Sequence, residues 1–527
     1  MTNRPVICVL VIFISAACFL HLYILPSDEI YFKIKQILQI IKQIFKQILQ
    51  IIKQILQIFK PTRIFPKPTQ IYPKPTRIHP KPTRIFPKPT QIHPKPTQIH
   101  PKPTQIHPKP TQIHPKPTQI HPKPTQIHPK PTHIYPKPTP KACGVQVEDD
   151  PGIKVGSLHT YVIGSYMDHR FNVKQIKMIA IVLRDEKVTY RCVMCCEGRN
   201  VTSPAEYTIH YDHFDFEYGT ATITCQIHSS CSTPTHVALT ASEISDSITS
   251  FQPIRNRDVP TVFPYSFTVC ISVMYDYENV LGLVQAMEMF RLLGAQRVVI
   301  YKTNCDSDIQ KVLDYYVKSG FVEIIPWTIK KHINVSNGWR KSDSPGQLHY
   351  YGQIPALNDC VYRYMYQSRY LALHDMDEFI LPLKVKSWTD LLRELENTYG
   401  TNVGFEFENN IFPCTAKPDY GQTKWKNVRG MNILNCIERE VPISLDNFKI
   451  IVNPRLVLRV NVHGIEETVK HQRYYTVRVQ NSIARMYHIK SYSTNTKLVR
   501  DDHLNDYAGD LVPAVSKVLQ DCGFINE

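Results

Sequence analysis

The sequence predicts an α/β domain at the C-terminal end of the chain, preceded by a small β-rich domain, a proline-rich stalk and an N-terminal membrane anchor. After Pro260, apolar runs typical of buried strands alternate with helical periodicity, which indicates a parallel, Rossmann-like sheet with both faces covered. Short β-branched stretches precede that region, and a seven-residue proline repeat precedes those stretches. We therefore divide the 527 residues into segments 1–30, 31–59, 60–142, 143–260 and 261–527.

The first segment contains an apolar stretch without charged residues. Residues 6–25 are twenty residues free of Asp, Glu, Lys and Arg, and as a helix they span about 30 Å, the thickness of a bilayer core. An uncleaved signal anchor behind a short tail fits this length. A cleaved signal peptide fits the small residues Ser15, Ala16 and Ala17. Both interpretations place residues 143–527 outside the cytosol.

Isoleucine recurs at alternating spacings of three and four in segment 31–59, from Ile34 to Ile58. This is the spacing of a coiled-coil seam, and it favours a homo-oligomer larger than a dimer. Lysines spread along the same segment also fit a basic amphipathic helix that lies on a membrane. A low-complexity expansion without a partner is the third interpretation, and the sequence leaves all three open.

Segment 60–142 repeats the unit Lys-Pro-Thr-x-Ile-x-Pro eleven times, from Lys60 to Pro136. Two prolines in each unit exclude a helix, so we expect an extended spacer on the order of 250 Å long. Residues 1–142 hold 22 Lys and Arg residues but two acidic ones. Because the whole chain carries +17, the remaining residues carry about −3. The basic character belongs to the solvated repeat, so no nucleic-acid partner is required.

Segment 143–260 contains short runs typical of strands, beginning at Thr160, Met178, Val188, Ala221 and His236. Twelve of the 14 cysteines lie between Cys143 and Cys522, and this even number fits disulfides in an oxidising compartment. Zinc is the competing interpretation for Cys192, Cys195 and Cys196, although Cys225 and Cys231 are poorly spaced as a second ligand pair. We expect a disulfide-linked β domain that positions or recognises a substrate.

Segment 261–527 begins with four expected strands at 267–275, 297–301, 321–326 and 370–374, separated by expected helices at 278–293, 306–319 and 354–368. Ligands of such sheets bind beyond the carboxyl ends of the strands. Polar residues follow three of these strands, and we expect four of them to contact a nucleotide: Tyr275, Asp276, Asn304 and Asp375.

An acidic cluster of Asp375, Asp377 and Glu378 ends the fourth strand. Two aspartates one residue apart, with no basic residue beside them in the sequence, suit a hard divalent cation that itself binds phosphate oxygens. A solvated strand end or a helix cap is the plainer interpretation. The cluster indicates a metal-dependent enzyme acting on a nucleotide-diphosphate donor. The alternatives are a non-catalytic lectin-like or extracellular-matrix protein on an extended stalk, and a metal-dependent phosphotransferase or hydrolase.

Residues from about 155 to 495 resemble glycosyltransferase family 92, a nematode-rich set of type II membrane proteins. The resemblance lies in Gly164-Ser-Tyr-Met-Asp-His-Arg, Val273-Met-Tyr-Asp-Tyr-Glu-Asn, Tyr351-Gly-Gln-Ile-Pro-Ala-Leu-Asn-Asp-Cys, His374-Asp-Met-Asp-Glu-Phe-Ile-Leu-Pro, Ile451-Val-Asn-Pro-Arg through His463, and Met486-Tyr-His-Ile-Lys. It implies a GT-A domain that moves a hexose, galactose in the known cases, from a UDP-sugar to a glycan acceptor with Mn²⁺ (or Mg²⁺). It also implies a single-pass type II protein of the Golgi or secretory-pathway membrane, with the catalytic domain in the lumen.

The resemblance implies that Asp375 and Asp377 bind the metal and the diphosphate. A C-terminal histidine often completes such a site, and His488 is the first candidate and His463 the second. The ending Met486-Tyr-His-Ile-Lys departs from the more usual His-Tyr-Arg, which leaves a role for the final lysine open. If transfer inverts the anomeric carbon, a carboxylate must deprotonate the acceptor hydroxyl, and we predict Glu406 or Glu408. The plainer interpretations are a hydrogen-bonded structural histidine and a half-exposed strand.

Overall fold

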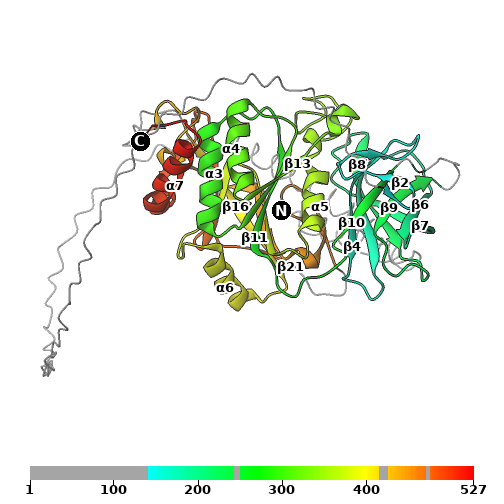
Figure 1. Ribbon diagram of the computed structural model, residues 1–527. Coiled ribbons are helices and arrows are strands. Elements are labelled where there is room, and N and C mark those ends of the chain that lie inside the picture. Colours follow the sequence, from blue (N-terminus) through cyan, green and yellow to red (C-terminus); the bar gives the residue numbers. More distant parts are fainter. Residues whose placement is uncertain (1–140, 242–247, 249, 415–424, 470–474, 527) are drawn as a thin grey trace, which may run out of the picture. The chain divides into compact units, whose positions relative to one another are not determined.

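The computed structural model describes residues 141–527 except 242–247, 249, 415–424, 470–474 and 527 (Figure 1). The predicted anchor, the isoleucine heptads and residues 60–140 of the predicted stalk lie outside the described residues. None of the described helices combines the length and the apolar character that a membrane span requires. The described residues form two large sheets. The second sheet and its helices form the α/β structure that the sequence predicted after Pro260.

The first sheet contains ten strands in the order β1-β2-β10-β9-β6-β7-β8-β5-β4-β3. A further pairing of β10 with β4 joins the two ends of the seven-strand path between them, so these strands form a barrel-like ring. All five strand runs predicted in this part of the sequence are confirmed. The strands are β1 (Lys141–Ala142), β2 (Val145–Val147), β3 (Ile153–Lys154), β4 (Thr160–Asp168), β5 (Gln175–Leu183), β6 (Tyr190–Cys196), β7 (Arg199–Ile209), β8 (Tyr218–Gln226), β9 (His236–Ala241) and β10 (Ser250–Arg255).

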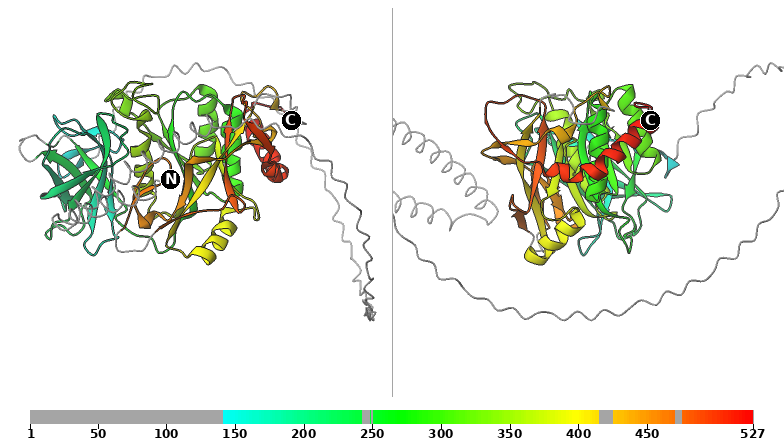
Figure 2. Two further views of the ribbon diagram at one scale, coloured as in Figure 1. Left: turned by 180° about the vertical axis from the view of Figure 1, so that it is seen from behind. Right: turned by 90° about the vertical axis from the view of Figure 1, so that its left-hand side faces the viewer.

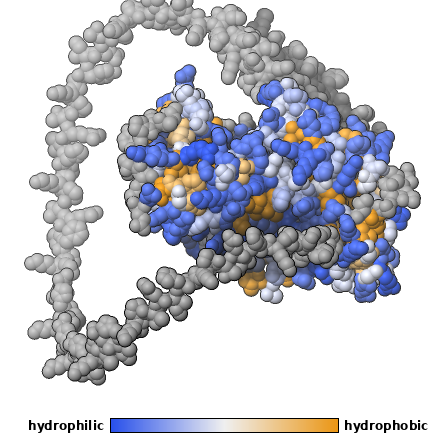
Figure 3. Space-filling view, turned by 45° about the horizontal axis from the view of Figure 1, so that its top comes forward, coloured by the Kyte–Doolittle hydropathy of each residue, from blue (hydrophilic) through white to orange (hydrophobic). Residues whose placement is uncertain are grey.

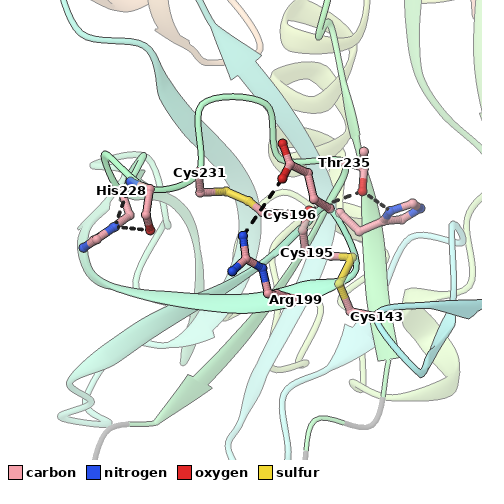
Figure 4. The surroundings of a disulfide bond; sticks show 10 residues. Cys143, Cys195, Cys196, Arg199, His228, Cys231 and Thr235 are labelled. Atoms are coloured by element: carbon pink, nitrogen blue, oxygen red, sulfur yellow. Dashed lines mark hydrogen bonds and ion pairs between the residues drawn. A yellow bond between two sulfur atoms is a disulfide. The ribbon is translucent and has the colours of Figure 1, made fainter.

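Disulfides link this sheet, and the prediction of disulfides rather than zinc is confirmed. Cys195 and Cys196 are neighbours on β6, and because successive strand residues point to opposite faces, they bond different partners (Figure 4). The described pairs are Cys143–Cys195, Cys192–Cys225, Cys196–Cys231, Cys270–Cys360 and Cys414–Cys436. Cys305 and Cys522 are free thiols.

The second sheet has the order β13-β12-β11-β14-β18-β16-β22-β15, with β21 beside β16. The first four strands are parallel, as predicted, and β18 then runs antiparallel to β14. The strands are β11 (Tyr265–Met274), β12 (Arg297–Lys302), β13 (Val322–Pro326), β14 (Ser368–His374), β15 (Glu378–Pro382), β16 (Val403–Pro413), β18 (Ser444–Val452), β21 (Tyr475–Arg478) and β22 (Ala484–Lys490). Two small sheets pair β17 (Glu438–Val441) with β23 (Lys497–Arg500) and β19 (Val457–Val460) with β20 (Ile465–Thr468).

The helices cover both faces of the second sheet (Figures 1 and 2). Residues of α3, α4, α6 and α7 pack against one face, and α5 packs against the other together with residues of β4 and β5. The helices are α3 (Val280–Leu293), α4 (Ser307–Lys318), α5 (Gln353–Arg363), α6 (Trp388–Tyr399) and α7 (Ala508–Asp521). Short 3₁₀ turns lie at Ile329–Lys331, Tyr350–Gly352, Ile433–Asn435, Pro454–Leu456 and His503–Tyr507. The predicted helix 354–368 is wrong at its end, because β14 already begins at Ser368 to pair with β11.

A buried hydrogen-bond network joins the two sheets at Asp359 of α5. Its carboxylate accepts hydrogen bonds from the hydroxyls of Tyr166 (β4) and Tyr301 (β12, 2.6 Å). Arg363, one turn further along α5, lies 2.9 Å from the same carboxylate. Every member is buried, so each polar group depends on its partners within the network.

Candidate functional site

A cavity of about 460 Å³ lies at the carboxyl ends of β11 and β14. The end of β11, the first turns of α3 and α5, the segment between β14 and β15, and the end of β22 line it. In a parallel sheet this is the edge where strands end and helices begin, which is where ligands bind. Of the polar segments predicted from the sequence, those that follow β11 and β14 meet at this cavity, whereas the segment after β12 does not line it.

The acidic turn lies on the wall of this cavity. β14 ends at His374, Asp375 and Asp377 line the cavity, and Glu378 opens β15. The two aspartate side chains are 34% and 43% exposed, whereas that of Glu378 is 2% exposed. A buried Glu378 oxygen accepts a hydrogen bond from the backbone N–H of Asp375 at 3.0 Å, which fixes the turn. The two aspartates are thus the accessible members of the cluster.

Two lysines from distant strands pair with these carboxylates. Lys449 of β18 lies 2.8 Å from Asp375 Oδ2 and 3.2 Å from Glu378, and Lys490 of β22 lies 3.1 Å from Asp377. Burial would raise the pKa of Asp375, but the charge of Lys449 outweighs burial and holds that pKa below its ordinary value. Burial would also raise the pKa of Asp377, but the nearby ring of His488 and the charge of Lys490 outweigh burial and lower it. The sequence places no basic residue beside the aspartates, but the fold does.

His488 is held with one ring nitrogen toward Asp377. β22 pairs antiparallel with β15, so His488 stands opposite Glu378. The Nδ1 atom of His488 lies 3.1 Å from Asn409 Oδ1, and Nε2 lies 3.6 Å from Asp377 Oδ2 without a hydrogen-bond partner in the described residues. An amide oxygen that accepts the Nδ1 proton leaves a lone pair on Nε2, which is the arrangement of a metal-binding histidine.

The donor set of Asp375, Asp377 and His488 fits a divalent cation chemically, since carboxylate oxygens and an imidazole suit Mn²⁺. Three carboxylates face two lysines here, so the cluster has a net negative charge of about one unit, which a cation would neutralise. Within the described residues no three such side chains converge to form a metal site, because Asp375 is turned toward Lys449. Asp377 and His488 therefore form the better-prepared part of the site.

The residues predicted to bind a nucleotide divide into two groups. Tyr275 lines the cavity with Asp375, stacks on Tyr351 at 3.6 Å between ring centroids, and shares a 2.8 Å hydrogen bond with the hydroxyl of Tyr350. Asp276 and Asn304 instead hydrogen-bond each other and do not line the cavity. Their role here is to join the ends of β11 and β12.

The predicted base residues and the second histidine lie outside the lining of the cavity. Glu406 and Glu408 both belong to β16. Burial raises the pKa of Glu406, and Arg478 offsets this only in part. Gly464 borders Glu406, and a Cβ atom on that glycine would lie 3.9 Å from Glu406 Oε1. His463, next in the chain, is bonded to the backbone of Phe448, which favours its structural interpretation.

Sequence reasoning missed several groups that act on the acidic turn. Ser272 Oγ (3.2 Å) and Gln353 Nε2 (3.3 Å) both donate to Asp375 Oδ1, and Lys449 bonds its other oxygen. The sequence contained a signal for Lys449, because this charged residue directly precedes Ile450 and Ile451, two apolar residues that are buried. No comparable local signal marks Ser272.

Comparisons with known proteins agree with the resemblance seen in the sequence. The glycosyltransferase family 92 model matches residues 265–513, and Tyr265 is also the first residue of β11. The chain is 22% identical over 362 residues to the "Beta-1,4-galactosyltransferase galt-1" of Caenorhabditis elegans, a span of 63% of this chain and 74% of that relative. It is 25% identical over 145 residues to the C. elegans "Glycosyltransferase family 92 protein F13G3.3" (27% and 28% of the two chains). A third C. elegans relative, "Glycosyltransferase family 92 protein C33H5.2", is 20% identical over 171 residues (32% and 33%).

The matched region contains the whole second sheet and the cavity with its acidic turn. From this agreement between sequence family and structure we conclude that residues 265–513 of this chain form a glycosyltransferase family 92 domain.

Proposed function

We propose that this chain transfers a hexose from a nucleotide-diphosphate sugar to a glycan acceptor, in a GT-A type domain and with Mn²⁺ or Mg²⁺. The observation that carries the proposal is the pair Asp375 and Asp377, partly exposed at the carboxyl end of β14 in a cavity of about 460 Å³. Galactose from a UDP-sugar is the proposed donor group, because a relative similar over 74% of its length is named a beta-1,4-galactosyltransferase.

The acidic turn and the side chains paired with it have different proposed roles toward the donor; of these side chains, Asp375, Asp377 and Lys490 line the cavity. Asp377 and His488 would hold the cation, and Asp375 would complete the set. When bound, the cation neutralises the negative charge of the departing nucleoside diphosphate. Lys490 is 41% exposed at the cavity wall and can reach a phosphate oxygen, while buried Lys449 fixes the turn. Positive charge placed in advance of the reaction favours the transition state over the ground state.

Glu406 is the preferred base for the acceptor hydroxyl, and Glu408 is the second candidate. The raised pKa of Glu406 suits a general base that works near neutral pH. It borders Gly464, which follows His463 in the chain. Glu406→Gln and Glu408→Gln variants separate the two candidates, because the loss of the base removes acceptor transfer. If both variants keep transfer, neither residue is the base.

We also propose that the enzyme works in the secretory pathway, in the Golgi, as a type II membrane protein. The five disulfides of the described residues support an oxidising compartment. The apolar stretch 6–25 supports membrane attachment, and the isoleucine heptads support self-association. Immunolocalisation, with protease protection of the C-terminal domain, tests the location and the orientation.

A donor screen tests the central proposal. The full chain is incubated with a panel of UDP-sugars, with and without Mn²⁺, and release of UDP is measured. We expect one donor to be turned over only with the cation, and we expect the Asp377→Asn variant to lose most of this turnover. Asp521→Asn removes a carboxylate at the end of α7 and serves as the matched control. Equal turnover with and without a chelator would refute metal dependence, and turnover of no donor would refute the transferase.

A further inference from the structure

An aromatic cluster lies beside the cavity and is used by none of the steps above. It consists of Phe214, Trp339, His349, Tyr350 and His463, which we call the aromatic wall. The ring of Trp339 lies 5.2 Å from that of Phe214, 4.7 Å from His349, 5.9 Å from Tyr350 and 5.4 Å from His463. These residues come from four separate segments of the chain. They lie around one tryptophan only in the folded structure.

The aromatic wall reaches the surface. On the face shown in Figure 3, apolar patches are scattered among hydrophilic residues, so exposed apolar groups occur at several places on the described surface. Phe214 and Trp339 are each 36% exposed and belong to the few large apolar side chains that the described residues leave in water. Two exposed aromatic rings in contact are more informative than single exposed apolar residues, because contiguous apolar surface marks binding sites. An exposed tryptophan at the edge of a cavity is therefore a candidate binding surface.

Backbone strain accompanies the exposed rings. Phe214 and Asp215 both have positive φ angles (51° and 60°), as do Tyr350 and Tyr351 (32° and 53°). Bulky residues avoid this region, and such strain persists only where the surrounding structure imposes it. Strain of this kind concentrates at binding sites, and here it occurs at Phe214 and Tyr350, whose rings both contact Trp339.

The aromatic wall is continuous with the cavity. Tyr350 belongs to both, since it lines the cavity and shares a hydrogen bond with Tyr275. At the other end, His463 precedes Gly464, which borders Glu406. A molecule that covers Trp339 would therefore lie beside Tyr350 of the cavity and beside His463, which is one residue from the glycine that borders Glu406.

His349 gives the aromatic wall a polar element. It is buried, stacks on Phe214 at 4.2 Å, and neither ring nitrogen makes a well-formed hydrogen bond within the described residues. Burial lowers its pKa to about 4, and the backbone of Trp339 offsets this only in part, so the ring is neutral at physiological pH.

On the exposed side, Lys341 is paired with Glu217 at 3.5 Å. Exposed Asp215 and Arg340 stand beside the two exposed rings, so together with Lys341 and Glu217 the charges next to the rings cancel. Apolar ring faces without a net local charge suit a neutral sugar better than a charged one.

We propose that the aromatic wall is the acceptor subsite and that it binds a neutral saccharide, whose apolar C–H face stacks on Trp339. This rests on the proposed transferase function. It also assigns a role to the first sheet, because Phe214 comes from the connection between β7 and β8. The first sheet then contributes directly to the choice of acceptor.

The test uses the full chain with two readouts: transfer to a panel of neutral oligosaccharides, and binding of the same panel printed on an array. Trp339→Ala is expected to raise the acceptor KM roughly tenfold, with a much smaller effect on kcat, because one stacking contact is lost. Trp339→Phe should recover part of the affinity. Phe263→Ala, a change at an equally exposed ring (36%), should alter neither readout.

An unchanged acceptor KM in Trp339→Ala would overturn the proposal, as would tighter binding of acidic glycans or peptides than of neutral saccharides. If no donor is turned over at all, the transferase proposal fails, and the array alone then decides. Saccharide binding that is lost in Trp339→Ala and kept in Phe263→Ala would still support the subsite. Absence of any saccharide binding by the unaltered chain would refute it.

Discussion

Replacing Lys449 by Met tests the charge balance of the acidic turn. The lysine is buried, with a side chain 2% exposed, and it bridges Asp375 and Glu378. Methionine keeps much of the volume but removes the charge, so Glu378 remains buried without a cationic partner. Asp375, which is one-third exposed, keeps access to water. The cost therefore comes mainly from Glu378.

Removing one partner of a buried ion pair typically costs about 3–5 kcal/mol, because the remaining charge stays uncompensated. A domain is stable by about 5–15 kcal/mol in total, so the change should lower the unfolding midpoint clearly. Part of the loss should disappear in acid, because burial already raises the pKa of Glu378 and protonation then removes its charge. Lys449→Met should also free Asp375 to turn toward Asp377, so that Mn²⁺ restores more stability to the variant than to the unaltered chain.

Chemical denaturation with and without Mn²⁺ measures both effects, and titration calorimetry measures the affinity for the cation. Lys517→Met is the matched control: its lysine is 71% exposed and pairs with Asp521 on the surface, where ion pairs contribute little to stability. A Lys449→Met variant as stable as this control would refute the role of Lys449. Weaker cation binding by Lys449→Met would refute the idea that it competes for Asp375.

The remaining predictions concern the site and the core. Asp377→Asn and His488→Gln should each lower donor turnover about 10²–10³-fold if the cation stabilises the leaving group, as steady-state UDP release will measure; turnover within twofold would contradict this. Asp359→Asn should destabilise the fold by about 3–5 kcal/mol in urea unfolding, since it removes the charge that a buried arginine and two tyrosines share; a loss below 1 kcal/mol would contradict it. Burial lowers the pKa of His210 to about 3 and that of His349 to about 4, so the unfolded chain binds these protons first. Stability should then fall as pH drops below about 6.5, by about 2 kcal/mol for each histidine at pH 5, and equal unfolding midpoints at pH 7 and pH 5 would refute this.

Local patterns predicted the elements of the fold well and the site only in part. Strand and helix periodicity depends on neighbours in sequence, so β11, α3, β12, α4, β13 and β14 were found close to their true ends. The acidic turn was found for the same reason. Of its partners, His488 was predicted, but Lys449 was missed and the role of Lys490 was left open. The two lysines lie 74 and 113 residues further along the chain and reach the turn only through the pairing of strands. Such pairing depends on the whole sheet, which no single window of sequence contains.

The packing of α5 against β4 and β5 has a practical consequence for anyone who expresses this protein. The family match begins at Tyr265, yet the apolar cluster beneath α5 includes Tyr161, Ile163 and Ile179 from further upstream. A fragment that begins at the family boundary would expose the apolar face of α5 to water. Asp359 would also lose the hydrogen bond from Tyr166. We expect such a truncation to be insoluble, whereas one that starts at Lys141 keeps the interior whole. The smallest fragment that we expect to fold is therefore longer than the region that the family model matches.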